Sequence, residues 1–463
     1  MLSQKLTEDV LTAALDTGGD FADLFMEDKT VSTIKMIGGA VDRANSGRDY
    51  GVGLRILDGM FAVYAYTNDL SRDNLLQVAR QAAQAIRGTK RDLTLDLRKS
   101  VLTPRHLIRV LPQDVTKARK VEWMRRAHEA AKGYDPQISQ TEVLFSDEDQ
   151  NVLIANSDGL FVEDRRVRTR MSITAVATKG SEKQSGFYGP GAHRGLEFYD
   201  NLDIEWYARE AARTAVTMVN ADYAPSGKMP VIIDNEFGGV IFHEACGHGL
   251  EATSVAKKAS VFTDKVGELV ASPLVTAIDD GTIPNAWGSL NIDDEGTPTQ
   301  RNVLIENGVL KSYLIDKLGG RKMGMASTGS SRRESYKFAP TSRMNNTYIA
   351  AGDSMPEEII ADTEYALYCK YLGGGSVNTA TGEFNFAVRE GYLVRNGKIE
   401  QPVRGATLIG KGIDVLQKID RVGNNLGFGQ GMCGSISGSI PADVGQPMIR
   451  VSELTVGGRK GAK

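Results

Sequence analysis

The sequence predicts an α+β protein: an α/β N-terminal domain with antiparallel strands and flanking helices, followed by a β-rich C-terminal domain that is barrel-like or built of stacked sheets. Up to about residue 220, segments with helical periodicity alternate with strand-like segments. After residue 225, strand patterns dominate and no helical run of similar length recurs. Pro225-Ser226-Gly227 is typical of a linker, so we expect domains at residues 1–224 and 225–463.

Periodicity places the elements of the N-terminal part. Leu6, Val10 and Leu11 lie at helical spacing, which predicts a helix over residues 3–16. Asp58-Gly59 predicts a hairpin between two apolar runs. Further helices are expected at residues 75–86, 121–131 and 203–220. Strands are expected at residues 21–28, 31–37, 50–57, 138–146, 151–155, 160–178 and 182–188.

The C-terminal part begins with a buried strand at residues 229–233. Asp234 or Asn235 is placed to cap a helix that carries His243. Asn307-Gly308 and Asn396-Gly397 each lie between two apolar runs and predict hairpin turns. This part therefore combines one short helix carrying a histidine motif with many short strands.

Composition excludes several classes of function. The chain has 463 residues, 41% of them hydrophobic, and a formal net charge of −3, which gives no electrostatic footprint for direct nucleic-acid binding. No apolar run is long enough to span a membrane. Residues 1–20 lack the pattern of a signal peptide, so we expect a cytoplasmic protein. The three cysteines do not form a disulfide framework and are expected to be free thiols or metal ligands.

The most informative segment is residues 242–251, Phe-His-Glu-Ala-Cys-Gly-His-Gly-Leu-Glu. His243 and His248 are suited to hold a zinc ion, and Glu244 to take a proton from the water that the metal activates. Histidines at i and i+5 lie about 140° apart on a regular helix, too far to share an ion. We therefore expect an irregular helix with a one-turn π-bulge, favoured by Gly247.

A catalytic zinc usually has three protein ligands and one open position. Cys433, in the glycine-rich run Gly429-Gln430-Gly431-Met432-Cys433-Gly434, is the favoured third ligand. Glu251 and Cys246 remain alternatives, whereas Cys369 is expected to pack in a strand. The other histidines, His106, His128 and His193, have no acidic or thiol company and are expected to be packed.

With these residues in view, the chain resembles the TldD/PmbA family, and within it the TldD branch. The resemblance covers most of the second half. It rests on the motif at residues 243–251 and on several further segments: Asp293-Asp294-Glu295-Gly296-Thr297-Pro298, residues 302–308, Asp316-Lys317-Leu318, Arg332-Arg333-Glu334-Ser335-Tyr336, residues 343–348, Gly373-Gly374-Gly375, residues 405–410 and Gly431-Met432-Cys433-Gly434.

The resemblance implies a cytoplasmic metalloprotease. In that family zinc (Zn2+) is held by residues matching His243, His248 and Cys433, with Glu244 as the catalytic base. Members trim unfolded peptides or remove leader peptides. The family fold joins an α/β domain to a β-rich domain. The implied assembly is a dimer, either a homodimer or a heterodimer with a related subunit that lacks the zinc motif. Older labels in the family speak of modulating DNA gyrase.

One departure and one group of polar residues complete the comparison. After Gly434 this chain reads Ser435-Ile436-Ser437-Gly438, where the family often has a Lys-Asp-Gly-Gln-like run. Five polar residues are candidates for contacting a peptide backbone or carboxylate, and a structural polar network is the alternative. They are Arg332, Arg333, Tyr336, Arg343 and Asn346.

Three functions remain open from the sequence. The first is a zinc-dependent peptidase that binds extended peptides beside an edge strand, by backbone hydrogen bonds. The second is a non-catalytic peptide-binding or regulatory subunit acting on a DNA-topology enzyme, which would have no need for His243, Glu244, His248 and Cys433 together. The third is an amidase or deacylase using the same metal chemistry.

Overall fold

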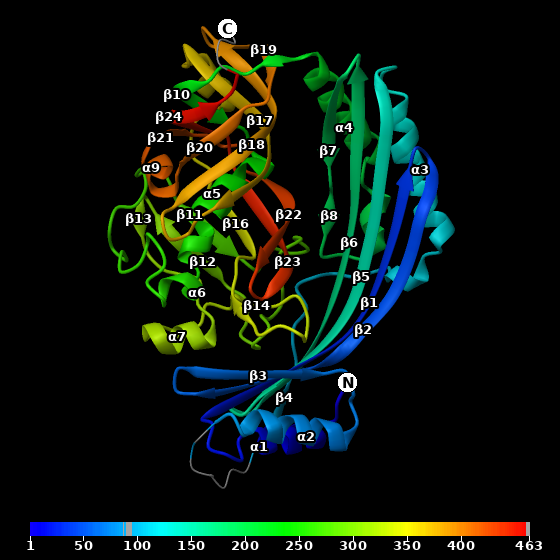
Figure 1. Ribbon diagram of the computed structural model, residues 1–463, viewed down its shortest axis with the longest axis vertical. Coiled ribbons are helices and arrows are strands. Elements are labelled where there is room, and N and C mark those ends of the chain that lie inside the picture. The colour runs from blue at the N-terminus through cyan, green and yellow to red at the C-terminus, as the bar shows by residue number, and fades with distance from the viewer. Residues whose placement is uncertain (87, 89–94, 460–463) are drawn as a thin grey trace.

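The computed structural model describes residues 1–86, 88 and 95–459, and its N-terminal part is built on one long, curved antiparallel sheet (Figure 1). The strand order is β3-β2-β1-β5-β6-β4, with β7 and β8 also paired to β6. The strands are β1 Phe21–Ile37, β2 Ala40–Asp58, β3 Phe61–Thr67, β4 Arg98–Ser100, β5 Ile138–Asn156, β6 Leu160–Lys179, β7 Glu182–Tyr188 and β8 Gly191–Ala192.

The expectation of short strands in this part was wrong. Residues 21–37 form the single strand β1, and residues 138–156 form the single strand β5. The polar residues Glu27, Asp28 and Lys29 lie where the first expected strand ends. They continue the strand because β2 and β5 pair with β1 on both sides there, and Gln150 donates a 2.6 Å hydrogen bond to Glu27. Because these polar groups are hydrogen-bonded within the sheet, the strand continues where we expected a break between two strands.

Four helices cover two regions of this sheet, and each region has its own apolar core (Figure 1). Two of them pack together beside β1 and β3, and the other two pack on β5, β6 and β7. The helices are α1 Gln4–Ala14, α2 Arg72–Ala83, α3 Lys117–Lys132 and α4 Ile204–Asn220, with 3₁₀ turns η1 Pro112–Asp114 and η2 Leu196–Asp200. Ser3, Thr116 and Asp203 cap α1, α3 and α4 by accepting backbone N–H groups, which explains where these helices begin.

The C-terminal part contains a closed five-stranded barrel. Hydrogen bonding runs β17-β10-β24-β20-β18, and β18 pairs back with β17 to close the ring. The barrel strands are β10 Gly227–Ile233, β17 Tyr365–Val377, β18 Glu383–Arg395, β20 Thr407–Lys411 and β24 Ile449–Gly457, and β9 Asp222–Tyr223, β19 Lys398–Arg404 and β21 Ile419–Val422 extend it. The expected α+β class with a barrel-like C-terminal part is confirmed.

A second sheet lies beside the barrel, in the order β13-β12-β11-β16-β23-β22 (Figure 1). Its last strand, β22, carries Cys433 and, among the described residues, pairs with β23 alone. The strands are β11 Ala277–Asp280, β12 Arg301–Glu306, β13 Val309–Leu310, β16 Asn346–Ile349, β22 Gly427–Ser435 and β23 Gly438–Gln446, with a separate pair β14 Ser331–Arg332 and β15 Thr341–Ser342. Short helices connect them: α6 Ala252–Val255, α7 Lys317–Met323, α8 Pro356–Ala361 and α9 Gly412–Gln417.

Buried ionic contacts join the long sheet to the C-terminal part. Arg55 on β2 is 2% exposed and contacts both Asp23 on β1 and, at 2.6 Å, Glu295. Arg166 on β6 donates a 2.6 Å hydrogen bond to Asp294. These charges are held away from water by partners on the other side of the seam, so the two parts stabilise each other's buried charges.

The remaining histidines are accounted for by packing, as expected. His106 and His193 stack with ring centroids 4.2 Å apart, and both are buried. Nδ1 of His106 accepts a hydrogen bond from the Asn285 backbone, and His193 contacts the Ser289 carbonyl at 2.9 Å. His128 is half-buried, with Nδ1 2.6 Å from the Thr141 hydroxyl.

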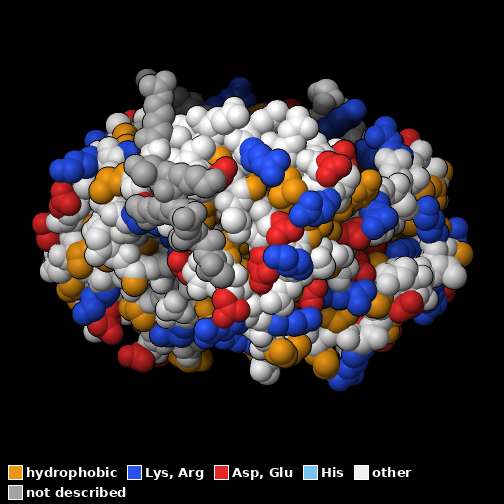
Figure 2. Space-filling model, turned by 90° about the horizontal axis from the view of Figure 1, so that it is seen from below, with side chains coloured by type: hydrophobic (Ala, Val, Ile, Leu, Met, Phe, Trp, Pro, Cys, Tyr) orange, Lys and Arg blue, Asp and Glu red, His pale blue; other side chains and the backbone are white. Residues whose placement is uncertain are grey.

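One end of the molecule carries surface charges of both signs. Figure 2 shows the end of the molecule that carries α1, α2 and β3, where Lys and Arg side chains are interspersed with Asp and Glu. Within the described ranges, no helix has both the length and the apolar character needed to cross a bilayer.

Replacing Arg55 with Met should destabilise the protein by about 3–5 kcal/mol, because Asp23 and Glu295 would stay buried without their counterion. Urea unfolding of the full chain measures this. The matched control is Arg48→Met on the same strand, which removes an exposed ion pair with Asp28 and should leave the unfolding midpoint nearly unchanged. Equal midpoints for the two variants would contradict a structural role for the seam.

Stability should fall as the pH is lowered from about 6.5 to about 4. Burial, and then the nearby charge of Arg168, lower the pKa of His106 to about 4. In this pH range the unfolded chain binds a proton that the folded chain does not, so the free energy of unfolding decreases by about 3 kcal/mol from this group. His106→Asn should flatten the dependence measured by unfolding at several pH values. An unchanged slope in the variant would show that other groups cause the acid sensitivity.

Candidate metal centre

A break in the helix brings the two histidines of the motif together. Strand β10 leads through the 3₁₀ turn η3, Glu236–Gly239, into the short helix α5, Val240–Ala245, which carries His243. At Cys246 the backbone leaves helical geometry (φ −131°, ψ −43°), and a second 3₁₀ turn, η4 Gly247–Leu250, carries His248. The expected π-bulge was therefore wrong: the helix ends and restarts in a new direction.

Gly247 lies directly after the break and packs closely against Met344. A Cβ added there would lie 2.2 Å from Sδ of Met344, a fully buried side chain, so a larger residue would have to displace that side chain. The start of the motif also differs from expectation. Asn235 occupies the cap position of η3, but its side chain donates to the Asn425 carbonyl instead of capping the turn.

Three donor atoms meet at the break. Nε2 of His243 lies 3.1 Å from Sγ of Cys433, and that sulfur lies 3.4 Å from Nε2 of His248. The imidazole rings are nearly perpendicular, at 86°, so their nitrogens converge from two directions. All the donor atoms of this group lie within 4.8 Å of one another. Two residues of the motif and the edge strand β22 thus supply one cluster.

The two other candidates for a third ligand lie outside this cluster. The Glu251 carboxylate contacts the far nitrogen of His248, Nδ1, at 3.2 Å, and also lies 4.0 Å from Nε of Arg343. This contact fixes the orientation of the His248 ring, as outer carboxylates do for metal-binding histidines. Cys246 is buried among apolar side chains of the C-terminal core, and burial raises the pKa of its thiol.

The electrostatics of the cluster favour a thiolate. Burial opposes ionisation of Cys433, but the adjacent His243 and His248 outweigh burial and lower the pKa of the thiol well below its usual range. For His248, burial disfavours the imidazolium, yet Glu251 and the Cys433 sulfur raise its pKa well above the usual value. A thiolate is the form of cysteine that binds metals.

The geometry fits a transition-metal ion. Tetrahedral zinc with Zn–N near 2.0 Å and Zn–S near 2.3 Å requires N–S separations of about 3.5 Å, and the two observed separations are close to this. Nδ1 of His243 is buried with no hydrogen-bond partner among the described residues. Two imidazoles and a thiolate form a donor set that zinc accepts readily.

Glu244 lies beside the cluster at a solvent-accessible cleft. Its Oε2 is 3.7 Å from Nε2 of His248, the nitrogen that faces Cys433, and its side chain is 24% exposed. The cleft has a volume of about 610 Å³. It is lined by Glu244, His248, Glu251, Thr253, Ser254, Lys257, Ala259, Gly375, Ser376, Val377, Thr379, Gly434, Ser435 and Ile436.

The five polar residues proposed to contact a peptide are buried, and none of them lines this cleft. Arg343 lies closest to the cluster: its guanidinium donates to the Cys433 carbonyl and, at 2.9 Å, to Ser437. Asn346 donates to Ser289 at 2.7 Å, and the backbone of Tyr336 donates to Glu27 at 2.9 Å. Arg332 and Arg333 line a different cavity.

The segment that departs from the family pattern forms the turn after β22. Ser437 is fully buried against Arg343, whereas Ile436 is 68% exposed at the cleft. Sequence reasoning missed the roles of Met344 and Arg343. Glu251 was recognised from its position three residues after His248. It was considered as a possible metal ligand and not as a carboxylate that orients the His248 ring.

The donor set and the carboxylate at its side are typical of a metal-dependent hydrolase, and comparison with known families narrows the class to metallopeptidases. Residues 22–86 match the sequence model of PmbA/TldA metallopeptidase domain 1, residues 111–219 that of the central domain, and residues 226–458 that of the C-terminal domain.

Relatives extend over nearly the whole chain. A "Metalloprotease TldD homolog" of Haemophilus influenzae is 38% identical over 449 residues, covering 95% of this chain and 93% of the relative. A "Metalloprotease" of Methanothermobacter thermautotrophicus is 33% identical, covering 95% and 96%. A "Zinc metalloprotease TldD homolog" of Saccharolobus solfataricus is 28% identical, covering 70% and 72%. The chain belongs to the TldD/PmbA family of metallopeptidases.

Solved structures share the fold. A Thermotoga maritima protein described as a candidate modulator of a DNA gyrase superposes with a TM-score of 0.81 at 22% identity, covering 98% of this chain and all of that one. TldE from Thermococcus kodakarensis superposes with a TM-score of 0.78 at 19% identity, covering 97% and 99%. At these identities the likeness establishes the fold alone.

Replacing Gly247 with Ala should lower zinc affinity about tenfold or more, because the added methyl displaces the segment that carries His248. Competition with a chelator measures the affinity. The matched control is Gly434→Ala beside Cys433, where an added Cβ meets nothing within 4 Å and zinc affinity should be kept. Equal affinities for the two variants would show that the close approach at Gly247 does not position His248.

Proposed function

We propose that this chain is a zinc-dependent peptidase that hydrolyses unfolded or extended peptides. The observation that carries the proposal is the convergence of His243, His248 and Cys433 beside Glu244 at an open cleft. These three residues would hold one zinc ion, and zinc is named for the Saccharolobus relative. A bound zinc would polarise the peptide carbonyl and acidify a water molecule.

The chain's own residues supply the proton transfers. Glu244 is partly exposed and faces the cluster, so its carboxylate is placed to accept a proton from the attacking water and to deliver it to the leaving amine. Glu251 orients His248 through Nδ1, and Arg343 holds the carbonyl of Cys433. Arg343 thereby fixes the strand that carries the third donor.

The cleft suits an extended peptide. Its wall at residues 375–377 belongs to the end of β17, which pairs with β18 on one side there; β10 contacts β17 only at residues 367–369. Within the described ranges, this edge therefore offers backbone groups to a further strand. Pairing through the backbone depends little on side chains, which would give broad specificity and would allow leader peptides as substrates.

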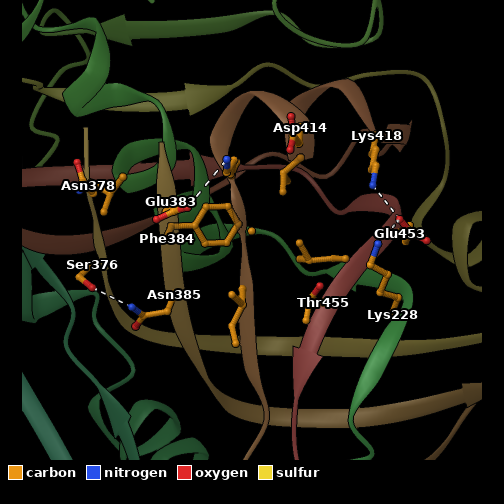
Figure 3. Close-up of a pocket in the computed structure, with 16 residues that line it drawn as sticks. Lys228, Ser376, Asn378, Glu383, Phe384, Asn385, Asp414, Lys418, Glu453 and Thr455 are labelled. Carbon is orange, nitrogen blue, oxygen red and sulfur yellow. Dashed lines mark hydrogen bonds and ion pairs between the residues drawn. The ribbon is translucent and has the colours of Figure 1, made fainter. Parts of the chain in front are cut away.

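A larger groove adjoins the cleft and is lined by residues of all five barrel strands and of α9. It has a volume of about 790 Å³ and shares Ser376 and Val377 with the cleft. Figure 3 shows Phe384 on its floor, with Lys418 and Glu453 paired at 2.9 Å on its rim. A peptide held at the cleft could extend into this groove, which would favour long unfolded chains over compact ones.

We also propose an assembly and a cellular location for this chain. We propose a dimer, either with a second copy or with a related subunit that lacks the zinc motif, as the family resemblance implies. We propose a cytoplasmic location. A non-catalytic gyrase modulator or an amidase remains the alternative, and the first would leave Glu244 without a role.

Glu244→Gln should retain zinc and lower peptide turnover about 100-fold or more, because the amide cannot accept the proton. Hydrolysis of an unfolded substrate and zinc content are measured on the same preparation. Zinc retained with undiminished turnover would remove Glu244 from the mechanism. An enzyme that cleaves a non-peptide amide but no peptide would support the amidase alternative.

Unfolded polypeptides should be cleaved, whereas the same polypeptides in their folded state should resist, because only an extended backbone can pair with the edge of β17. A reduced, unfolded protein and its native form, compared by mass spectrometry of the products, test this. Equal cleavage of both forms would contradict the extended-strand model.

A further inference from the structure

A second cavity, separate from the cleft at Glu244, lies at the seam between the two parts of the chain. It has a volume of about 410 Å³, within the range of small-molecule sites. Its walls come from β5 and β6 on one side, and from residues 287–294, residues 332–334 and the β22–β23 hairpin on the other. In Figure 1, β22 and β23 face β6 and β8 across this seam.

Arginines converge on the cavity from both walls. Arg166, Arg168 and Arg170 alternate along β6 and so project from the same face of the sheet. Arg332 and Arg333 reach the cavity from the opposite wall. Together with Lys29, six cationic side chains line the cavity, against the three anionic side chains of Glu148, Asp294 and Glu334.

The available carboxylates leave part of this charge without an ionic partner. Arg166 pairs with Asp294 and, at 3.6 Å, with Asp164. Arg168 pairs with Glu148, and Lys29 pairs with Glu27 at 3.9 Å. Within the described ranges, Arg170 and Arg332 have no carboxylate within ion-pair distance. Arg170 donates to two backbone carbonyls, at Gly189 and Gln430.

Arg332 is nearly fully buried, and among the described residues its side chain donates to a backbone carbonyl and not to a carboxylate. It is 3% exposed, and one guanidinium nitrogen donates to the Met344 carbonyl at 2.8 Å. Burial, followed by repulsion from Arg168, lowers the pKa of Arg332 to about 9. A buried cation without a counterion is costly, and an anion between these guanidinium groups would relieve that cost.

Part of the cavity wall is apolar, which favours an organic anion over an inorganic one. Trp287, Leu290, Ile440 and Pro441 line it, and the Arg170 guanidinium lies 5.6 Å from the centroid of the Trp287 ring. Guanidinium groups beside apolar side chains suit a carboxylate attached to a carbon skeleton, because both portions find a matching surface. We propose that this cavity binds a carboxylate carried by a peptide segment. The proposal does not depend on hydrolysis at Glu244.

Calorimetric titration with two blocked peptides tests the proposal. The probes are N-acetyl-Ala-Glu-Glu-Ala-amide and its Gln-Gln counterpart, which differ only in side-chain charge. The full chain carries Glu244→Gln so that neither probe is consumed. The acidic probe should bind about tenfold or more tightly than the neutral one, the range expected for charge-assisted hydrogen bonds. Equal affinities would overturn the proposal.

Variants locate the site. Leu144, at the cavity wall, is 36% exposed, so substitutions there are expected to be tolerated by the fold. Leu144→Glu places a competing carboxylate at the cavity and should abolish the preference for the acidic probe, whereas the matched Leu144→Gln should keep it. Arg332→Gln should weaken binding of the acidic probe about tenfold. An unchanged preference in Leu144→Glu would place the probe elsewhere.

A parallel titration with sodium phosphate distinguishes the source of the anion. Binding of phosphate without any preference between the two peptides would overturn the peptide carboxylate as occupant and leave an inorganic oxyanion. Weak phosphate binding beside a clear preference for the acidic peptide supports the proposal, because the apolar walls contribute only to the organic ligand.

Discussion

The missing side chain at Gly247 is the constraint on which the candidate metal centre depends. The buried Met344 sulfur occupies the space that a Cβ would take, so a larger residue at this turn would have to displace Met344. That turn changes histidines five positions apart from divergent side chains into convergent ones, facing a cysteine 185 residues away from His248 in sequence. The convergence of the three donor atoms beside Glu244 therefore depends on this backbone geometry.

Buried polar side chains connect this turn to the rest of the molecule. Arg332 holds the backbone of Met344, and Arg343 holds the carbonyl of Cys433 while approaching Glu251. The seam ion pairs at Arg55 and Arg166 in turn hold the long N-terminal sheet against the same region. Such contacts are strongly destabilising when broken, so they fix the donor atoms within a rigid frame. The arginine-lined cavity adjoins this frame, because Met432, the neighbour of Cys433 on β22, lines it.

Much of the fold was predictable because local signals are strong. The helices at residues 3–16 and 203–220, the turns at Asn307-Gly308 and Asn396-Gly397, and the strand-rich C-terminal part agree with the structure. The lengths of β1 and β5 were not predictable, because Glu27 is satisfied by Gln150, which is distant in sequence. The motif indicated His243 and His248, and Cys433 was favoured over Glu251 and Cys246 as the third donor. The break between the two histidines was expected only as a π-bulge, because Met344, which packs against Gly247 at the break, lies about a hundred residues away in sequence. The burial of Arg332 and Arg333 likewise depends on the seam between the two parts.

The most direct test of the central claim is X-ray absorption at the zinc edge, measured on the zinc-loaded full chain and on Cys433→Ser. A site built from His243, His248 and Cys433 should show one sulfur near 2.3 Å and two imidazole nitrogens near 2.0 Å in the unmodified chain, with the sulfur lost in the variant. A spectrum of the unmodified chain with only nitrogen and oxygen neighbours, or a sulfur that persists in the variant, would contradict a site built from His243, His248 and Cys433.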